Sequence, residues 1–499
     1  MSEQFNFDQI PYDWVEPGNF MEVRPNYRNA GIFPWPVKSL IIAQKLPSGT
    51  LPELTLQEIV NPDDAITFLG QGSIGAAQVK AFRSANRTTP LYVIALEDAD
   101  GAVKATGGIT FSGAISRAVV MRFLIGGKQV RVTFEAADDV DAMASKLADA
   151  INDDDELLVT AAAVAGSCNV TCRHGGEIGD EIDLRVDARA QPVPDGLTIG
   201  IFDMSNGSGN PDVSRVYDEI ANLWFTEETH PWVDPTNMAH SAVELRDRYT
   251  AMSKLDCHGF YFKRSTYGQL GAFGELTNEP FITAMGLNRS PTPSWEAAAS
   301  VMGIAAFHLT NDPARQLRSL VVPGLVAPDP ADRFTETEQD LLLRRGISTF
   351  DHLDDGTTVI SRMVTTYKMS NLGTPDRAWM DIMVPRTMSR IRYDWNVYVS
   401  LLYPRAKLTD DEEGAAFVGN VEDDEFPGNV VVTPRRMHGS WAARCRLYSD
   451  KVWIEDVERT VKESRFGRDP DNDNRMNANQ QVKIVGNLMT LAAALEFQV

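Results

Sequence analysis

Apolar segments alternate with amphipathic ones along the first hundred residues. Ser39–Gln44 and Leu91–Leu96 are short, continuous apolar runs, which are typical of strands buried on both faces of a parallel sheet. Residues 58–69 and 74–83, which lie between these runs, have the apolar spacing of helices. This alternation predicts an α/β layer, and we expect the same pattern to resume at Leu197.

A stretch of different texture interrupts this pattern between residues 99 and 190. Residues 118–134 alternate like the two strands of a hairpin, with Gly126-Gly127 as the turn. Val140–Asn152 has the spacing of an amphipathic helix, and residues 157–186 return to strand-like patterns. We therefore expect a β-rich domain at 99–190, inserted into a discontinuous α/β domain at 26–98 and 191–360.

The remainder of the chain predicts buried helices and a few strands. Residues 292–309 are apolar on nearly every side, and Thr292 and Pro293 are the expected N-cap and first helical residue. Strand-like residues near 429–433 and a helix near 440–450 follow. We expect an α+β C-terminal domain at 361–499, and a multidomain α/β plus β fold for the whole chain.

Both ends of the chain carry apolar residues in segments that have no evident way to bury them. Residues 491–499 (LAAALEFQV) are mostly apolar and no turn or cap follows, so we expect the chain to stop within a strand. An N-terminal arm at 1–25 lacks periodicity and is interrupted by Pro11 and Pro17, yet it contains Phe5, Phe7, Tyr12, Trp14 and Phe20. Because an unpaired strand edge recruits another chain, these ends predict a subunit that reaches into its neighbours.

Composition is that of an ordinary globular protein. The 499 residues are 43% hydrophobic and 23% charged, and the length predicts about three domains. No apolar run approaches the roughly 20 residues that span a bilayer, so we expect no membrane insertion. The start, MSEQFNFDQ, lacks the regions of a signal peptide, and we expect the chain to stay in the cytoplasm in which it is made.

Charge is unevenly distributed along the chain. The net charge of −22 argues against a nucleic-acid partner, because it would repel the phosphate backbone. Residues 361–499 contain 19 Lys+Arg and 20 Asp+Glu, so residues 1–360 carry −21 (28 positive, 49 negative). The near-neutral part is rich in arginine: Arg386, Arg390, Arg392, Arg405, Arg435, Arg436, Arg444 and Arg446. These residues predict either a solvated face or a basic surface that meets an acidic partner.

The segment from Gly70 to Gly75 matches the GxGxxG pattern of a dinucleotide-binding loop. Glu97 and Asp98 follow about 20 residues later, where an acidic partner of a ribose is expected. Residues 61–69 read as a short helix, however, so no strand leads into the loop. We expect a glycine-rich loop between two helices and no cofactor.

Other chemistry is absent from the sequence pattern. The histidines never pair at ligand spacing, and neither a GxSxG nor an HExxH motif occurs. The acidic clusters at 410–413 and 423–425 lie in glycine-containing segments and read as solvated turns. We predict no catalytic residue and no metal site.

Cys168 and Cys172 lie in a strand-like segment, SCNVTCRH. Four residues along a strand span about 13 Å, whereas bridged Cα atoms lie within about 7 Å, so these two cysteines cannot bond each other. Free thiols are expected in a cytoplasmic product. The alternative is a pair of intersubunit disulfides that form once a particle has left the cell.

Segments in a fixed order carry a resemblance to a known family. They are SLIIAQKL, GGEIGDEID, SWEAAA, NDPARQLRSL, LLLRRGIST, SRMVTTY and VTPRR, together with an arm that contains Ile10-Pro11 and Pro17-Gly18. With these segments the chain resembles the tail sheath proteins of contractile-tailed phages, in the Mu-like branch of the subtilisin-like sheath family. Cys168 and Cys172 are not part of that family pattern.

The resemblance implies an arrangement of domains and of partners. The C-terminal domain would lie innermost against the tail tube protein, with Arg435, Arg436, Arg444 and Arg446 as candidate contacts. The α/β domain would have a subtilisin-like fold without protease activity, and the inserted domain would face outward. Terminal strands would be exchanged between copies in a helical homo-oligomer, through Phe20, Met21, Glu22, Val23, Leu495, Glu496, Phe497, Gln498 and Val499.

The expected function is therefore mechanical. Sheath subunits would assemble in the host cytoplasm, become part of the virion, and contract to drive the tube through the host envelope for genome delivery. Baseplate and tail terminator proteins are the further partners that the resemblance implies. A baseplate or other tail structural protein is the alternative, and an enzyme that binds a nucleotide at Gly70–Gly75 is a third reading.

Overall fold

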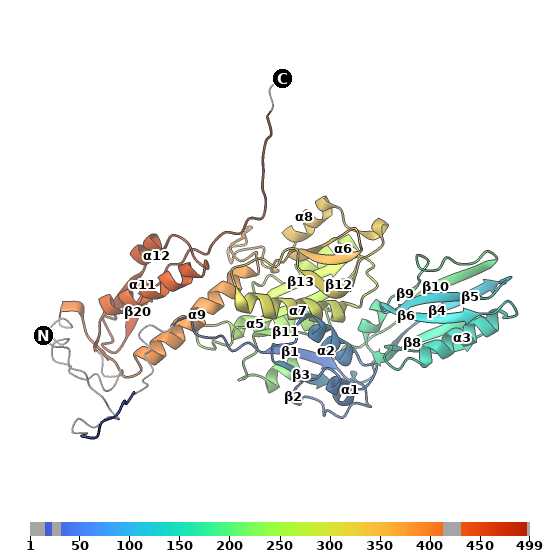
Figure 1. Ribbon diagram of the computed structural model, residues 1–499, viewed down its shortest axis with the longest axis horizontal. Coiled ribbons are helices and arrows are strands. Elements are labelled where there is room, and N and C mark those ends of the chain that lie inside the picture. Colours follow the sequence, from blue (N-terminus) through green and yellow to red (C-terminus); the bar gives the residue numbers. More distant parts are fainter. Residues whose placement is uncertain (1–14, 22–30, 413–430, 497–499) are drawn as a thin grey trace. The chain divides into compact units, whose positions relative to one another are not determined.

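The computed structural model describes residues 15–21, 31–412 and 431–496, which form two compact units. Of these residues, the larger unit contains 36–389 and 486–496, and the smaller unit contains 15–21, 31–35, 390–412 and 431–485. This division differs from the expected domain border at 361, because residues 361–389 belong to the larger unit. The mixed α/β multidomain fold is confirmed (Figure 1).

A nine-stranded sheet forms the centre of the larger unit. Its strands from β15 to β3 are parallel, and the flanking strands β14, β16 and β2 are antiparallel. In spatial order they are β14 (Val321–Val326), β16 (Thr357–Arg362), β15 (Ile347–His352), β13 (Ile282–Leu287), β12 (His258–Arg264), β11 (Glu227–Thr229), β1 (Ser39–Gln44), β3 (Leu91–Leu96) and β2 (Leu56–Glu58). The predicted bounds of β1 and β3 are confirmed, whereas β2 occupies the start of a predicted helix.

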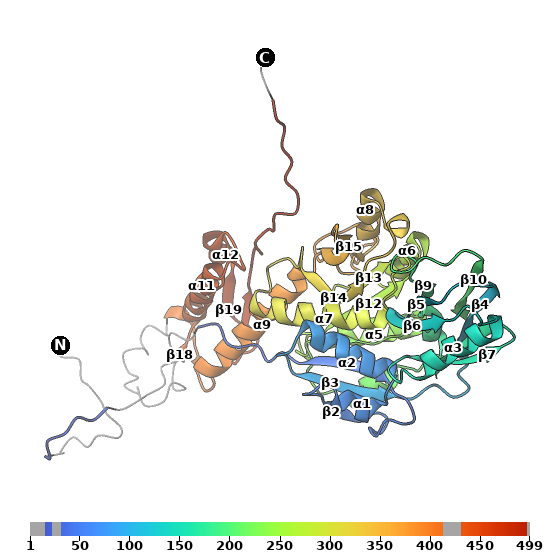
Figure 2. The ribbon, with the colours of Figure 1, turned by 45° about the vertical axis from the view of Figure 1, so that its right-hand side comes forward.

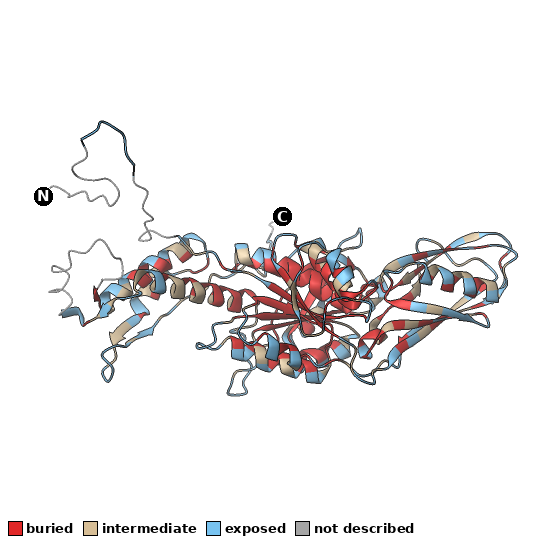
Figure 3. Ribbon diagram, turned by 90° about the horizontal axis from the view of Figure 1, so that it is seen from below, coloured by how far each residue is buried: buried red, intermediate tan, exposed pale blue. Residues whose placement is uncertain are grey.

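Helices cover both faces of this sheet, which is why its strands read as continuous apolar runs. Ile41 and Ala43 of β1 face α2 (Ile74–Ala85) and α7 (Ser294–Asn311), while Leu40 and Ile42 face the opposite core. The second face is covered by α4 (Ser214–Glu219), α5 (Pro235–Arg248) and α6 (Tyr267–Glu275). Short helices α1 (Asp64–Leu69) and α8 (Glu336–Arg344) complete the unit, and Figure 3 shows burial concentrated at the sheet and the helix faces against it.

Close packing of α2 and α7 depends on Gly303. A Cβ atom at this position would lie 3.0 Å from the Phe82 carbonyl oxygen and 3.1 Å from the Ala85 Cβ. The two helices lie side by side in Figures 1 and 2. The buried helix predicted near 292–309 is confirmed as α7, although Pro293, not Thr292, is its N-cap.

The inserted part of the larger unit consists of two antiparallel sheets and a helix. One sheet has the order β10-β4-β8-β7 and the other the order β6-β5-β9. In chain order the elements are β4 (Lys104–Gly113), β5 (Val119–Ile125), β6 (Lys128–Phe134), α3 (Val140–Asn152), β7 (Val159–Val164), β8 (Ser167–Gly175), a 3-10 helix (Glu177–Glu181), β9 (Leu184–Val186) and β10 (Leu197–Ser205). The predicted Gly126-Gly127 turn is confirmed, since both residues have positive φ (54° and 78°).

The insertion extends further than the sequence suggested. β10 pairs with β4, and a bridge between Val103 and Ser208 closes the insertion. The expectation that the α/β layer resumes at Leu197 is therefore wrong. The strand character of β10 is local, but its partner lies far back in the chain, and no local pattern reveals such a pairing.

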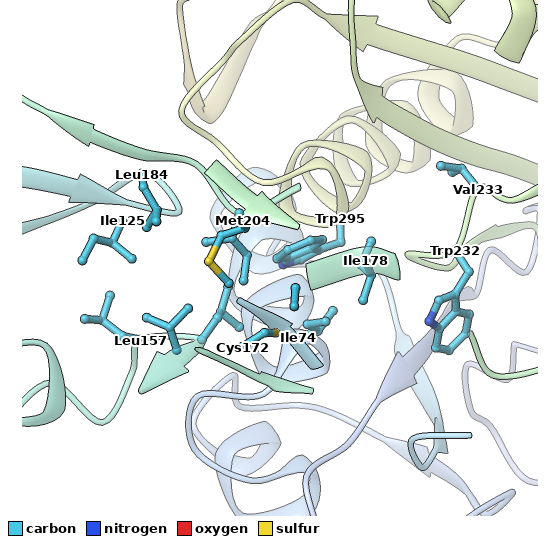
Figure 4. Close-up of a cluster of buried hydrophobic side chains, with 14 of the residues drawn as sticks. Ile74, Ile125, Leu157, Cys172, Ile178, Leu184, Met204, Trp232, Val233 and Trp295 are labelled. Atoms are coloured by element: carbon cyan, nitrogen blue, oxygen red, sulfur yellow. The ribbon is translucent and has the colours of Figure 1, made fainter. Parts of the chain in front are cut away.

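Apolar and polar contacts join the insertion to the α/β layer. Ile178, Met204 and Cys172 of the insertion share a buried cluster with Ile74 and Trp295 (Figure 4). Beside it, Asp98 at the end of β3 accepts hydrogen bonds from Gly175 N–H (2.7 Å) and from the Gln44 amide (2.8 Å).

His174 extends this polar contact into the N-terminus of α2. Its Nε2 accepts the Ile74 N–H at 3.1 Å, so its Nδ1 carries the proton and donates to Asp98, also at 3.1 Å. Burial lowers the pKa of His174, which favours this neutral form. Burial raises the pKa of Asp98, but hydrogen bonds from His174 and Gly175 outweigh that effect and hold the pKa below its usual value.

The smaller unit is built from helices and short ribbons. Helix α9 (Met383–Leu402) begins in the larger unit and continues into the smaller one, where α11 (Pro434–Asp450) and α12 (Val457–Glu463) follow. The ribbons pair β17 (Lys407–Leu408) with β18 (Val431–Val432) and β19 (Arg465–Arg468) with β20 (Met476–Asn479). The helix predicted near 440–450 is confirmed as α11. Helix α9 was not predicted, because several of its buried residues, such as Arg386 and Asp394, are polar.

Replacing Asp98 should destabilise the larger unit. Asp98→Ala removes the shared acceptor of His174, Gly175 and Gln44, and a buried donor left unpaired costs about 1–3 kcal/mol. Urea unfolding of the variant should therefore have a lower midpoint. Asp100→Ala is the matched control, because that carboxylate is exposed. Equal midpoints for the two variants would contradict the role of Asp98.

Candidate assembly surfaces

The GxGxxG loop lies between α1 and α2, as predicted, and its helix end is already occupied. Ser73 caps α2 by accepting the Ala76 N–H, and the Ile74 N–H is bound to His174. A Cβ atom on Gly72 would lie 2.7 Å from the Asp155 carbonyl oxygen of the insertion. The donors that would hold a phosphate therefore bind the protein's own groups.

One serine–histidine pair exists that the sequence reading did not find. His230 Nε2 lies 2.8 Å from Ser241 Oγ, beside the hydroxyls of Tyr217 and Tyr261, which donate to Glu228. Ser241 is 0% and His230 1% exposed, and burial lowers the pKa of His230 to about 3. A nucleophile sealed in this way cannot meet a substrate, so the pair belongs to the core. Its members come from different elements, and no motif marks them.

Across the described ranges, no group of His, Cys, Asp and Glu side chains is arranged to hold a metal ion. In that same part of the chain, no helix is long and apolar enough to cross a bilayer.

The four arginines predicted to face a partner do not share one surface. Arg435, Arg436 and Arg446 are exposed on α11. Arg444 lies on the same helix but is only 1% exposed, so its prediction as a surface contact is wrong. Arg386 and Arg390 are buried as well, and the high arginine content therefore reflects internal pairing as much as a basic face.

Arg444 is buried because it pairs with Asp394, a fully buried carboxylate of α9. Arg444 Nε donates to Asp394 Oδ2 at 3.0 Å, its second nitrogen Nη2 also donates there, and the Tyr448 hydroxyl donates at 2.6 Å. The guanidinium centre lies 5.0 Å from the Tyr398 ring centroid and 5.4 Å from that of Phe33. A charged pair with these partners is satisfied inside the unit.

The same cluster holds the root of the N-terminal arm. Phe33 N–H donates to Asp394 Oδ1 at 2.9 Å, and the Gly31 carbonyl accepts from Arg444 at 3.2 Å. Arg390 donates to the Phe33 carbonyl and lies 5.5 Å from the Trp453 ring centroid. We call Asp394, Arg390 and Arg444 the arm clamp. It holds residues 31–33 through hydrogen bonds to their backbone.

The cysteines cannot form the proposed intersubunit disulfides. Cys168 and Cys172 lie on β8 with exposures of 0% and 1%, so their sulfur atoms cannot reach another subunit while the insertion is folded. Burial raises the pKa of Cys168 to about 12 and that of Cys172 to about 11. Cys257 and Cys445 are buried free thiols as well.

The described parts of both terminal arms are exposed and lie outside any strand. Phe20 is 54% and Met21 91% exposed, and Leu495 reaches 95%. Glu496 is exposed too. Glu22, Val23, Phe497, Gln498 and Val499 lie outside the described residues. Met21 and Leu495 therefore expose most of their apolar surface within the described part of this chain.

The β19–β20 ribbon of the smaller unit is an incomplete sheet. Its two strands pair through Arg465–Asn479 to Arg468–Met476, and Phe466 packs edge-on against Trp395 and His438. A two-stranded ribbon is at best marginally stable alone, and its outer edges offer backbone groups to further strands.

Comparison with known proteins gives a consistent picture. No family model matches the chain. The chain is 27% identical over 461 residues to the Mu-like prophage FluMu tail sheath protein of Haemophilus influenzae, covering 92% of both chains. The resemblance to tail sheath proteins that the sequence predicted is confirmed.

Solved structures share the fold at much lower identity. A chain of the anti-feeding prophage baseplate is 12% identical, with a TM-score of 0.50 and coverage of 97% of this chain and 99% of that one. A chain of the same prophage's baseplate in the contracted state is 10% identical, with a TM-score of 0.50 and coverage of 97% and 98%. At these identities the likeness concerns the fold.

Loss of Asp394 should release the arm and unfold the smaller unit more easily. Asp394→Ala leaves the Arg444 guanidinium buried without its carboxylate, which typically costs about 3–5 kcal/mol. Urea unfolding should show this loss, and limited proteolysis should remove the first thirty-odd residues faster. Asp450→Ala, at the exposed end of α11, is the control. If Asp394→Ala were as stable to urea as that control, the arm clamp would not contribute to the stability of the smaller unit.

Proposed function

We propose that this chain is the structural subunit of a contractile tail sheath, polymerising helically around a tail tube. The observation that carries the proposal is the relation to a Mu-like tail sheath protein over 92% of both chains. The chain is a structural protein and not an enzyme, in keeping with that relative. Its place is in the virion, as part of the tail.

Strand exchange is the proposed way in which neighbouring copies join. Two observations support this idea. Both arms carry exposed apolar residues that an added strand could bury, and the two-stranded β19–β20 ribbon could accept such a strand. Residues 491–499 have Leu, Ala, Leu, Phe and Val at alternate positions, which gives an added strand one apolar face. Arms added to the ribbon of another copy would cover these side chains and pair the open edges.

The layers of the assembled sheath are those that the resemblance to sheath proteins implies. We place the smaller unit, with exposed Arg435, Arg436 and Arg446, against the tube, the α/β layer in the middle, and the insertion outward. The subtilisin-like fold of the α/β layer belongs to this proposal. Baseplate and terminator proteins would meet the ends of the polymer.

Contraction would draw its energy from contacts between subunits. The GxGxxG loop is filled by the insertion, so its geometry supplies no support for nucleotide hydrolysis. An additional 200 Å² of apolar surface buried per subunit would stabilise the contracted state by about 5 kcal/mol. A lattice that becomes shorter and wider could gain such area while exchanged strands keep the copies joined.

A baseplate protein is the second candidate function. Two solved chains with a TM-score of 0.50 come from structures of the anti-feeding prophage baseplate. Negative-stain microscopy of the purified chain separates the two functions, because a sheath subunit forms long tubes and a baseplate protein forms a closed small oligomer. Closed rings without tubes would favour the baseplate.

Removing the C-terminal arm should abolish polymerisation without unfolding the chain. Deletion of residues 491–499 takes away only residues whose described side chains are exposed, so the urea midpoint should change little. Tubes should not form, because no strand reaches the neighbour. Full-length Leu491→Asp with Leu495→Asp should behave alike. Tubes from either chain would contradict strand exchange.

Charge reversal on α11 should weaken binding to the tube and spare self-assembly. Arg435→Glu with Arg446→Glu reverses exposed charges, so tube-dependent assembly should fall and its salt dependence should shrink. Arg436 is left unchanged because it donates to the Val431 carbonyl. Arg87→Glu with Arg117→Glu, both exposed in the larger unit, is the control pair. Equal tube binding by the two pairs would remove α11 from the interface.

A further inference from the structure

The C-terminal segment is held at two places before it leaves the protein. In the smaller unit, Val485 N–H donates to the Trp453 carbonyl at 3.1 Å and Ile484 bridges to Ile454. From residue 486 onward the chain belongs to the larger unit. There a second attachment, made by Asn487 and its neighbours, precedes the exposed residues 491–496.

This second attachment consists of side-chain hydrogen bonds to backbone. Asn487 Nδ2 donates to the Ala314 carbonyl at 2.8 Å, and its Oδ1 accepts the Gln316 N–H at 3.3 Å. In return, Gln316 Nε2 donates to the Leu488 carbonyl at 3.2 Å. Arg318 donates to the Met489 carbonyl at 3.2 Å, and the Met489 side chain packs against the core between the sheet and α7. We call this set of contacts the Asn487 clip.

The chemistry of the clip makes it specific and easy to open. A carboxamide offers one donor and one acceptor side by side, so Asn487 pairs with the 314–316 backbone as another peptide would. Residues 486–490 lie outside any strand and form no ladder of strand pairs. Opening the clip therefore breaks a few partly exposed hydrogen bonds and one apolar contact, and it unravels no sheet.

The clip also separates the roots of the two arms. The N-terminal arm is rooted at residues 31–33 by the arm clamp of the smaller unit, whereas the C-terminal arm is rooted at 487–489 on the larger unit. With the clip closed, the free arm is residues 490–499, which span at most about 33–36 Å. With the clip open, the free arm begins at residue 486 and reaches about 13 Å further.

We propose that the Asn487 clip is a reach-setting device, closed in the extended sheath and opened when the lattice contracts. This inference rests on the proposed function. A wider lattice moves neighbouring copies apart, so an exchanged strand must either leave its sheet or gain length at its root. Opening the clip releases residues 486–489, which lengthen the free arm, so the exchanged strand can stay paired.

The first test uses the isolated chain and does not depend on polymerisation. Hydrogen exchange should show protection of the Gln316 amide, because it donates to Asn487. Asn487→Ala removes both carboxamide bonds, so exchange at Gln316 should become about tenfold faster or more. Thr490→Ala, just beyond the clip, should leave it unchanged. Equal exchange in wild type and Asn487→Ala would overturn the clip.

The second test locks the clip in assembled sheath. Gln316→Cys and Leu488→Cys place thiols on either side of it, and a short bismaleimide that a reductant cleaves can join them. The native cysteines are buried with raised thiol pKa values and should not react. Locked subunits should form extended tubes that do not contract under urea, and cleavage by reductant should restore contraction.

The single variant Leu488→Cys, treated with the same reagent, controls for modification of the arm. Locked tubes that contract like this control would overturn the reach-setting role, even though the clip itself exists. A wild-type chain that forms no tubes at all would instead count against the proposed sheath function. The two failures are therefore distinguishable.

Discussion

A buried carboxylate organises the smaller unit. Asp394 accepts hydrogen bonds from the Arg444 guanidinium and the Tyr448 hydroxyl, both on α11, and from the Phe33 N–H near the N-terminus. Desolvating a charge of this kind is costly unless every partner is present, so the helices and the root of the arm must come together at once. Phe33, at the root of the N-terminal arm, is in this way tied to a residue 361 positions further along the chain.

In the α/β layer, the position at which related sheets bind ligands is occupied by a contact with the insertion. In open α/β sheets, ligands bind beyond the carboxyl ends of parallel strands, next to a helix N-terminus. Here the ends of β1 and β3 carry Gln44 and Asp98, and both bind the end of β8 in the insertion. A histidine takes the place at α2 that a phosphate would occupy. The geometry of a binding site is kept, and an inserted domain fills it.

What the sequence predicted correctly was local. β1, β3, the Gly126-Gly127 turn and the helix Val140–Asn152 follow from patterns within a dozen residues, and their bounds are confirmed. The errors concern partners that lie far apart. The pairing of β10 with β4, the burial of Arg444 by Asp394 and the Ser241–His230 contact depend on side chains from remote segments. An arginine-rich helix predicts a basic surface. The sequence alone does not show that one of its arginines, Arg444, pairs with a buried carboxylate on another helix.

The sheltered thiols have a consequence for the lifetime of the protein. Only ionised sulfur attacks disulfides or peroxides readily, and a thiol with a pKa of about 11 or 12 is almost never ionised near neutral pH. The folded chain can therefore pass from a reducing compartment to air without acquiring covalent cross-links. In a sheath of the proposed kind, this chemical inertness would preserve each subunit between assembly and contraction.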